Sequence, residues 1–355
     1  MRLPVTVRLH GLSLVDLMVG LAVGMIAMLV ILNVMVMFDA RRRATTGSSD
    51  AQTNAVFATS VLSRELRIAG HGLGAATGLG CTVHRSALNV PDASFLLVPV
   101  LIDNGNGGEP DRLTILAAGE QALPPARLIA PYTNNGGELT VNSTLGITPN
   151  AQLLLRSTGS SDCALLTTRS VAVGGYAVQP VPDSDVLPGA VFGSDSPIVN
   201  VGMLAHRRYS VDMNQQLSVE TFDAIGGVWR ASTLAEGVVN LQAQYGFDAR
   251  AGALTPTQVT QWRDDIIDAD GNGIVGNAGD WQRMLAVRIA VVTRVAQRRD
   301  EACDSTAPTW LAGISGTDKL EVTTIKVDHL TDWSCWRYRV LQTEVPLRNQ
   351  LWNDQ

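Results

Sequence analysis

Hydrophobic and polar residues divide the chain into a long apolar run, an amphipathic continuation and a region of many short apolar segments. The apolar run extends from Leu12 to Phe38, and Asp16 is its only ionisable residue. A helix needs roughly 20 predominantly apolar residues to cross a bilayer, and this run is longer. We therefore predict a transmembrane helix over residues 12–38.

Small and aliphatic residues recur at steps of three and four beyond the apolar run. They are Ala51, Ala55, Ala58, Leu62, Leu66 and Ala69. This spacing places them on one face of a helix. Gly70 and Gly72 follow, and glycine just after the last periodic residue is typical of a helix C-terminus. We expect the helix to continue through residues 39–72, bent or loosened near Gly47, with this face packed on a sheet.

Short apolar segments separated by Gly, Asn, Asp and Pro clusters follow from Cys81 onward. This pattern is typical of β-strands and turns. It predicts a β-rich middle region over residues 73–230 and a sheet region over residues 231–355. Three late segments, beginning at Met284, Leu320 and Cys335, are expected to form strands of one antiparallel sheet.

The composition excludes some classes of function. The formal net charge is -6, which argues against broad nucleic-acid binding because that requires a basic surface. The sequence has no HExxH, GxSxG or glycine-rich phosphate-binding motif. No pair of carboxylates stands out for acid–base catalysis. We therefore expect a protein that is not an enzyme.

Four cysteines are present, Cys81, Cys163, Cys303 and Cys335, and none forms a CxxC pair. A zinc ribbon or a thioredoxin-type motif is therefore not expected. In an exported domain an even number predicts two disulfides, for which three connectivities exist. Sequence order favours Cys81–Cys163 and Cys303–Cys335. Four free thiols are the alternative in a reducing compartment.

The segment DADGNGIVGNAGDW, which starts at Asp268, is a candidate Ca²⁺ site. Asp268, Asp270 and Asn272 have the spacing of positions one, three and five of an EF-hand loop. The carbonyl of Ile274 would be the next ligand, and Asp280 follows the position that normally carries a bidentate glutamate. The alternative is a metal-free turn, since Asn, Asp and Gly also favour turns.

The N-terminal residues resemble the cleavage motif of type IV prepilins. The motif is GLSLVDLMVGLAVG, beginning at Gly11. The resemblance implies that a prepilin peptidase removes residues 1–11 as a leader and methylates the new terminal residue, Leu12. Asp16 occupies the position of the family's glutamate, which pairs with the terminal amine of a neighbouring subunit. Leu12 stands where the family usually has phenylalanine.

Four further segments resemble PilW-type minor pilins. Three of them begin at Leu66, Leu234 and Leu285, and the fourth is VPLRN, which begins at Val345. Residues 81–230 carry no resemblance. The resemblance implies an α+β, pilin-like fold. In it, a long N-terminal transmembrane helix packs on an antiparallel sheet, and the sheet carries a large β-rich insertion.

The resemblance also implies a function, partners and a location. The chain would be a minor pilin in a priming or tip complex, with roles in adhesion and twitching motility. Its partners would be other minor pilins, the major pilin, the prepilin peptidase and the pilus assembly platform.

Two alternatives are a type II secretion pseudopilin and a membrane-anchored tip adhesin. The chain would cross the bacterial inner membrane once, with a periplasmic C-terminal domain that later reaches the pilus surface. Arg41, Arg42 and Arg43 alone would place that domain in the cytoplasm, but the cysteines favour the periplasm.

Overall fold

The computed structural model contains two compact units, Met1–Asp50 and Ala51–Gln355. It describes residues 14–73, 78–85, 94–119, 123–133, 137–156, 161–172, 175–181, 190–250, 252, 255–298, 303–313 and 319–351. Helix α1 (Leu14–Ile68) has 55 residues. The α+β class, with its long N-terminal apolar helix, is confirmed.

The first unit consists, over its described residues, of the N-terminal part of α1. Every Val, Leu, Ile, Met and Phe side chain from Leu14 to Phe38 is exposed around the whole helix. A helix that is apolar all round is stable when lipid or protein covers it. By length and composition α1 can cross a membrane. The helix continues through Gly47, where the sequence predicted a bend or a loosened turn.

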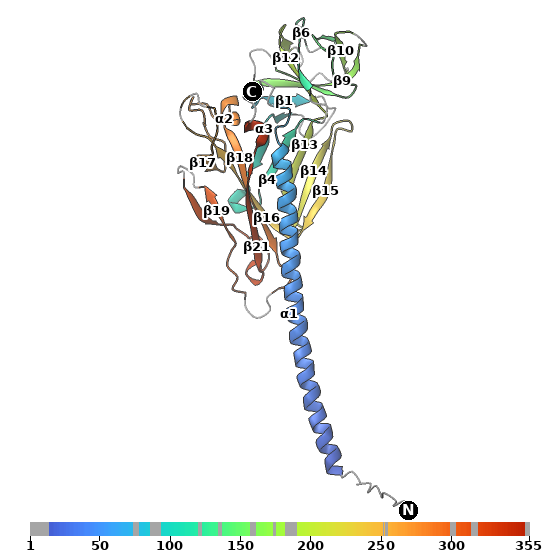
Figure 1. The fold of residues 1–355 in the computed structure, drawn as a ribbon, viewed down its shortest axis with the longest axis vertical. Coiled ribbons are helices and arrows are strands. Elements are labelled where there is room, and N and C mark those ends of the chain that lie inside the picture. The colour runs from blue at the N-terminus through green and yellow to red at the C-terminus, as the bar shows by residue number, and fades with distance from the viewer. Residues whose placement is uncertain are drawn as a thin grey trace, which may run out of the picture. The chain divides into compact units, whose positions relative to one another are not determined.

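The second unit contains two antiparallel sheets beside the C-terminal part of α1 (Figure 1). The order of the first sheet is β15–β14–β13–β4–β3, and that of the second is β17–β16–β18–β21. The first is formed by β3 (Val100–Asp103), β4 (Arg112–Ala117), β13 (Ala205–Val211), β14 (Gln216–Asp223) and β15 (Val228–Glu236). The second is formed by β16 (Val238–Phe247), β17 (Gln261–Arg263), β18 (Met284–Arg294) and β21 (Tyr338–Pro346).

The predicted apolar face of α1 is buried against both sheets. Ala58, Leu62 and Leu66 have no exposed surface and belong to one apolar cluster with side chains of both sheets. Along β18, Val287, Ile289 and Val291 join this cluster, because alternate residues of a strand share a face. Burying each leucine contributes about 1.5–3 kcal/mol.

Polar contacts hold α1 at both ends of this buried face. At its start, Thr293 Oγ1 donates a hydrogen bond to the carbonyl of Ala51 (3.0 Å). At its end, the Asn349 amide donates to the carbonyls of Ile68 (3.2 Å) and Ala69 (3.1 Å), which lack partners within the helix. Gly70 follows with φ 74°, as predicted for the residue that ends the helix.

An ion pair with a buried carboxylate joins the C-terminal end of the helix to β13. Glu65 is 6% exposed and pairs with the Arg207 guanidinium. The neighbouring Tyr209 is also buried, and burial raises the pKa of its hydroxyl. Removing one partner of such a pair would leave a buried charge uncompensated, which is costly. The pair therefore favours one position of the helix on the sheet.

The predicted middle region, residues 73–230, supplies most of the first sheet, and its other strands form an eight-stranded sheet and a separate two-stranded one. The path β2–β1–β9–β8–β12–β5 forms the main sheet, and β10 and β7 extend it from β9. Its strands are β1 (Thr82–Arg85), β2 (Ser94–Leu96), β5 (Leu123–Arg127), β7 (Leu139–Thr140), β8 (Gln152–Arg156), β9 (Asp162–Val171), β10 (Ala177–Pro180) and β12 (Pro197–Gly202). The separate two-stranded sheet is formed by β6 (Tyr132–Thr133) and β11 (Val191–Phe192). The strands β1 and β9 pair in parallel, whereas the other pairs are antiparallel.

One sequence prediction about the C-terminal sheet is wrong. The segments at Met284 and Cys335 form β18 and β21, which pair with each other. The segment at Leu320 instead forms β20 (Leu320–Thr324), which pairs with β19 (Thr309–Gly313) in a separate hairpin. In the second sheet β18 pairs on its other side with β16.

Long polar side chains of the second sheet connect it to β19. Arg288 on β18 is 1% exposed and donates to the Leu311 carbonyl (3.1 Å) and to Glu344 (2.6 Å). The Gln342 amide both accepts from and donates to the backbone of Leu311, and the Gln244 amide does the same for Gly313. Of these contacts, those of Gln244 satisfy buried backbone groups of Gly313, and those of Gln342 and Arg288 bond to the more exposed backbone of Leu311.

The remaining elements are short. They are the 3-10 helices η1 (Asn106–Gly108) and η2 (Trp333–Cys335) and the α-helices α2 (Ala278–Gln282) and α3 (Arg348–Leu351).

Asp111 connects the two sheets and has a displaced pKa. Its carboxylate accepts from the backbone N–H groups of Gly105 (2.9 Å) and Ala243 (2.7 Å). The residue is 4% exposed, and burial raises the pKa of its carboxyl to about 6. In the unfolded chain the value is about 3.9. The folded state therefore binds this proton more tightly than the unfolded state.

We expect this pKa to make stability depend on pH. The contribution of Asp111 to the free energy of unfolding should be greatest below about pH 4. It should be lost as pH rises through 6, with a total change of at most about 3 kcal/mol. Urea unfolding at pH 4–7 in non-ionic detergent, for wild type and Asp111→Asn, would measure this change. A constant difference between the two proteins over this range would contradict it.

Candidate functional site

The predicted Ca²⁺ loop lies between β17 and β18 and includes the short helix α2. One carboxylate oxygen from each of Asp268, Asp270 and Asp280 lies within 4.8 Å of the others. Ca²⁺ ligands lie about 2.3–2.6 Å from the ion, so two ligands of one ion are at most about 5 Å apart. The three carboxylates therefore have a spacing that one Ca²⁺ can bridge.

Asp268 is held by the backbone of the turn that follows it. Its two oxygens accept from the N–H groups of Gly271 (2.8 Å), Asn272 (3.0 Å) and Gly273 (2.7 Å). Gly271 and Gly273 have φ values of 75° and 85°, which glycine adopts without strain. The Gly273 N–H is the main cause of a lowered pKa at Asp268. The residue is thus a carboxylate, the form that binds cations, at neutral pH.

Asp280 is fully buried and closes the loop. It accepts from the N–H groups of Ala269 (2.6 Å), Asp270 (3.1 Å) and Gly276 (2.8 Å). It also forms a capping box with Asn277 at the start of α2. The structure therefore brings Asp280 to the loop centre although it lies one residue beyond the usual twelfth position.

Asn277 is a member of this site that the sequence analysis missed. Its amide nitrogen donates to the Ile274 carbonyl (2.6 Å), to Asn272 Oδ1 (3.2 Å) and to Asp280 Oδ2 (3.2 Å). All three acceptors belong to predicted Ca²⁺ ligands. The available signal was an asparagine placed just before a helix, where it serves as an N-cap.

The loop is anchored in the apolar core. Trp281 follows Asp280, is 1% exposed, and donates from its ring nitrogen to the Gly276 carbonyl (3.0 Å). Its ring meets that of Tyr245 edge to face, with centroids 6.1 Å apart. Anything that orders this loop therefore acts directly on the cluster that buries α1.

The predicted processing residues, Gly11 and Leu12, lie outside the described residues. Asp16 lies in the first turn of α1 as the structure describes it, and it is exposed within the first unit. This position is compatible with a contact to another subunit.

Two disulfides are present, Cys81–Cys163 and Cys303–Cys335, and no cysteine is free. Sequence order favoured this pairing. The first bridge links the start of β1 to β9, alongside their parallel pairing, and closes a separation of 82 residues. The second links Cys303 to η2. The alternative of four free thiols is not what the structure contains.

Part of the chain matches the model of one known protein family. Residues 201–349 match the family model PilW, described as type IV pilus-assembly protein W. The matched region contains β13–β21 and Asn349, and so includes much of the two sheets that bury α1. No curated protein and no solved structure matches the chain significantly. This region of the chain is therefore similar to PilW-type pilus-assembly proteins.

Proposed function

We propose that the chain is a minor pilin that acts in a priming or tip complex. The observation that carries this proposal is the pairing of two features. The part of α1 from Leu14 to Phe38 exposes apolar side chains all round, and residues 201–349 match a pilus-assembly family. A large unit such as Ala51–Gln355 would crowd a filament if every subunit carried it, which favours a place at the tip.

The apolar helix would hold the protein in the inner membrane before assembly. The two disulfides favour a periplasmic location for residues 51–355, because disulfides persist in oxidising compartments. In this proposal a prepilin peptidase cuts after Gly11 and methylates Leu12. Other minor pilins, the major pilin and the assembly platform would then bind the mature chain.

Asp16 would guide docking between subunits. A carboxylate in an apolar helix is costly in a membrane, about 2.5–3.5 kcal/mol at the helix centre, unless a partner compensates its charge. The amine of a neighbouring subunit's first residue would supply that charge. The match to a pilus-assembly family favours this role over that of a secretion pseudopilin. Adhesion and twitching motility would follow from the assembled pilus.

We also propose that the loop at Asp268 binds Ca²⁺. Three carboxylates lie within the span of one ion, and the Asn272 and Ile274 oxygens converge on the Asn277 amide. An ion at this centre would compete with the Asn277 amide nitrogen for these two oxygens, while Asn277 Oδ1 stays bonded to the Gly279 and Asp280 N–H groups at the start of α2. The ion would stiffen a loop that Trp281 anchors in the core.

Processing should leave Leu12 as the first residue. Mass spectrometry of the protein from cells with active prepilin peptidase should find an N-terminal peptide that starts at methylated Leu12. The uncleaved chain should accumulate when the peptidase is deleted or Gly11 is replaced by alanine. An intact residue 1 in peptidase-positive cells would contradict the proposal.

Asp16→Ala should impair pilus assembly while the protein still enters the membrane. The change removes the proposed partner of a terminal amine and makes the helix more apolar. Surface pili and the membrane-bound protein should be quantified in the same cells. Asp16→Glu is the matched control and should retain assembly because it keeps the charge. Normal piliation with Asp16→Ala would exclude the docking role.

Calcium should raise the melting temperature of the protein, since a ligand that binds only the folded state stabilises it. At 100 times the dissociation constant the gain is about 2.7 kcal/mol. Asp270→Asn should abolish the shift while keeping the shape of the side chain. Asp212→Asn changes a turn aspartate that likewise accepts backbone bonds, and should leave the shift intact. Equal melting temperatures with calcium and with chelator would rule out the site.

A further inference from the structure

Three consecutive arginines follow the apolar part of α1 inside the first unit. Arg41, Arg42 and Arg43 lie on the helix just beyond Phe38, and all three side chains are exposed. Asp39 lies three positions before Arg42 and four before Arg43, close enough on a helix to offset one charge. Three arginines less one aspartate leave two positive charges, in a protein whose net charge is -6. This short segment is therefore locally basic.

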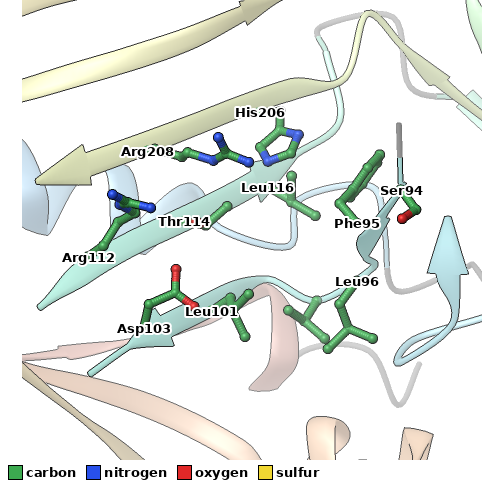
Figure 2. A pocket seen from close by; sticks show the side chains of 11 residues that line it. Ser94, Phe95, Leu96, Leu101, Asp103, Arg112, Thr114, Leu116, His206 and Arg208 are labelled. Carbon is green, nitrogen blue, oxygen red and sulfur yellow. The ribbon is translucent and has the colours of Figure 1, made fainter. Parts of the chain in front are cut away.

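The arginines that line a cavity in the second unit differ from these three. The cavity has a volume of about 270 Å³ and is lined mainly by β2, β3, β4 and β13, with Arg112 and Arg208 among its lining residues (Figure 2). Asp103 lies directly across the β3–β4 pair from Arg112, and Glu220 lies across the β13–β14 pair from Arg208. Each cavity arginine therefore has its own acidic neighbour, whereas the three arginines of α1 share Asp39.

The three arginine side chains leave the helix in different directions. Successive residues of an α-helix are about 100° apart, so three of them spread over about 200° of its circumference. The apolar side chains from Leu14 to Phe38 are likewise exposed all round. A protein that docks on one face of α1 would reach only part of this set. The headgroup layer of a bilayer surrounds a helix that crosses it, so it can reach every member.

The position of the arginines along α1 also suits a bilayer. The hydrocarbon core is about 30 Å thick and the whole bilayer about 40–45 Å, which leaves about 5–8 Å for each headgroup layer. As a helix, Leu14–Phe38 spans about 36 Å, enough to cross the core. By the same helical rise, Arg41 lies about 4.5 Å and Arg43 about 7.5 Å beyond Phe38. With Phe38 at the edge of the core, the long arginine side chains reach the depth of the lipid phosphates.

We propose that Arg41, Arg42 and Arg43 form an arginine collar that binds the phosphate groups of anionic phospholipids around α1. A guanidinium matches a phosphate in geometry and can donate two parallel hydrogen bonds to it. Anionic lipids are favoured because the positive headgroup of a zwitterionic lipid offsets the charge of its own phosphate. The inference rests on the proposed membrane anchoring by α1. It does not depend on which side of the membrane the second unit occupies, since both leaflets contain phosphates.

Spin-labelled lipids would test the proposal with the full chain in phosphatidylcholine bilayers. Electron paramagnetic resonance separates lipids whose motion the protein restricts from those in the free bilayer. The restricted fraction gives the association constant of labelled phosphatidylglycerol relative to that of labelled phosphatidylcholine. The wild type should favour phosphatidylglycerol, and this preference should weaken as salt is added because it is electrostatic.

Variants of the collar should change this relative association constant in both directions. Arg41→Gln/Arg42→Gln/Arg43→Gln should lower it about fivefold, the factor expected for one arginine–headgroup contact. Arg41→Lys/Arg42→Lys/Arg43→Lys should retain most of it, because lysine keeps the charge. Asp39→Asn should raise it, since the change removes the charge that offsets the collar. Such a gain is not an effect that loss of folding would produce.

The matched control removes three exposed arginines of the second unit, as Arg67→Gln/Arg169→Gln/Arg337→Gln. It changes the net charge by the same amount and should leave the relative association constant at the wild-type value. Arg2 and Arg8 are present in every variant, so differences between variants report on the collar.

Equal association of the two lipids with the wild type would overturn the proposal. An unchanged constant in the glutamine variant of the collar, or an equal fall in the control, would also overturn it. Restricted lipid without selectivity would leave the proposed membrane anchoring intact. The absence of any restricted lipid would overturn the anchoring together with the collar.

Discussion

Burial of one face of α1 between two sheets is the constraint on which the second unit depends. The face is made of alanines and leucines, and alanine lets the backbone of a helix approach a sheet closely. Ala58 and Leu62 share a single cluster with strands of both sheets, so neither sheet completes that core without the helix. The helix in turn ends at Ile68, just before Gly70, and the carbonyls of Ile68 and Ala69 accept from Asn349, almost at the other end of the sequence.

Polar groups determine where along the sheets α1 is positioned. Apolar contacts tolerate sliding of a helix along a sheet, whereas Glu65 must stay beside Arg207 to avoid an uncompensated buried charge. On the opposite face of the second sheet, Arg288 lies under Trp262 and bonds to Glu344 and to the β19 backbone. The sheet therefore has an apolar face towards α1 and a mixed one towards β19, where Ala290 and Val292 of β18 pack with Trp310 and Ala312 beside the polar contacts of Arg288. Alternation along β18 produces both faces.

Local patterns in the sequence predicted the elements well, and long-range pairing poorly. The three- and four-residue spacing from Ala51 to Ala69 identifies the buried face, since helix periodicity requires no partner to be known. The spacing also singled out Asp268 and Asp270, whose carboxylates the structure brings within 4.8 Å of that of Asp280. The segment at Leu320 has the composition of a strand, but composition does not specify a partner, and it pairs with β19. The parallel pairing of β1 with β9 was likewise invisible in the sequence.

The same distinction explains why sequence reasoning identified the loop but not the cavity that β2, β3, β4 and β13 line. Arg112 and Arg208 are 96 positions apart by their numbers, and they face one cavity only because β4 pairs with β13 in a register that sets Thr114 opposite Arg208. A shift of that register by one residue would turn Arg208 to the face that packs against α1. Tyr209 now occupies that face, and its place in the apolar cluster excludes the shift. The burial of α1 therefore determines which side chains the sheet presents on its opposite face.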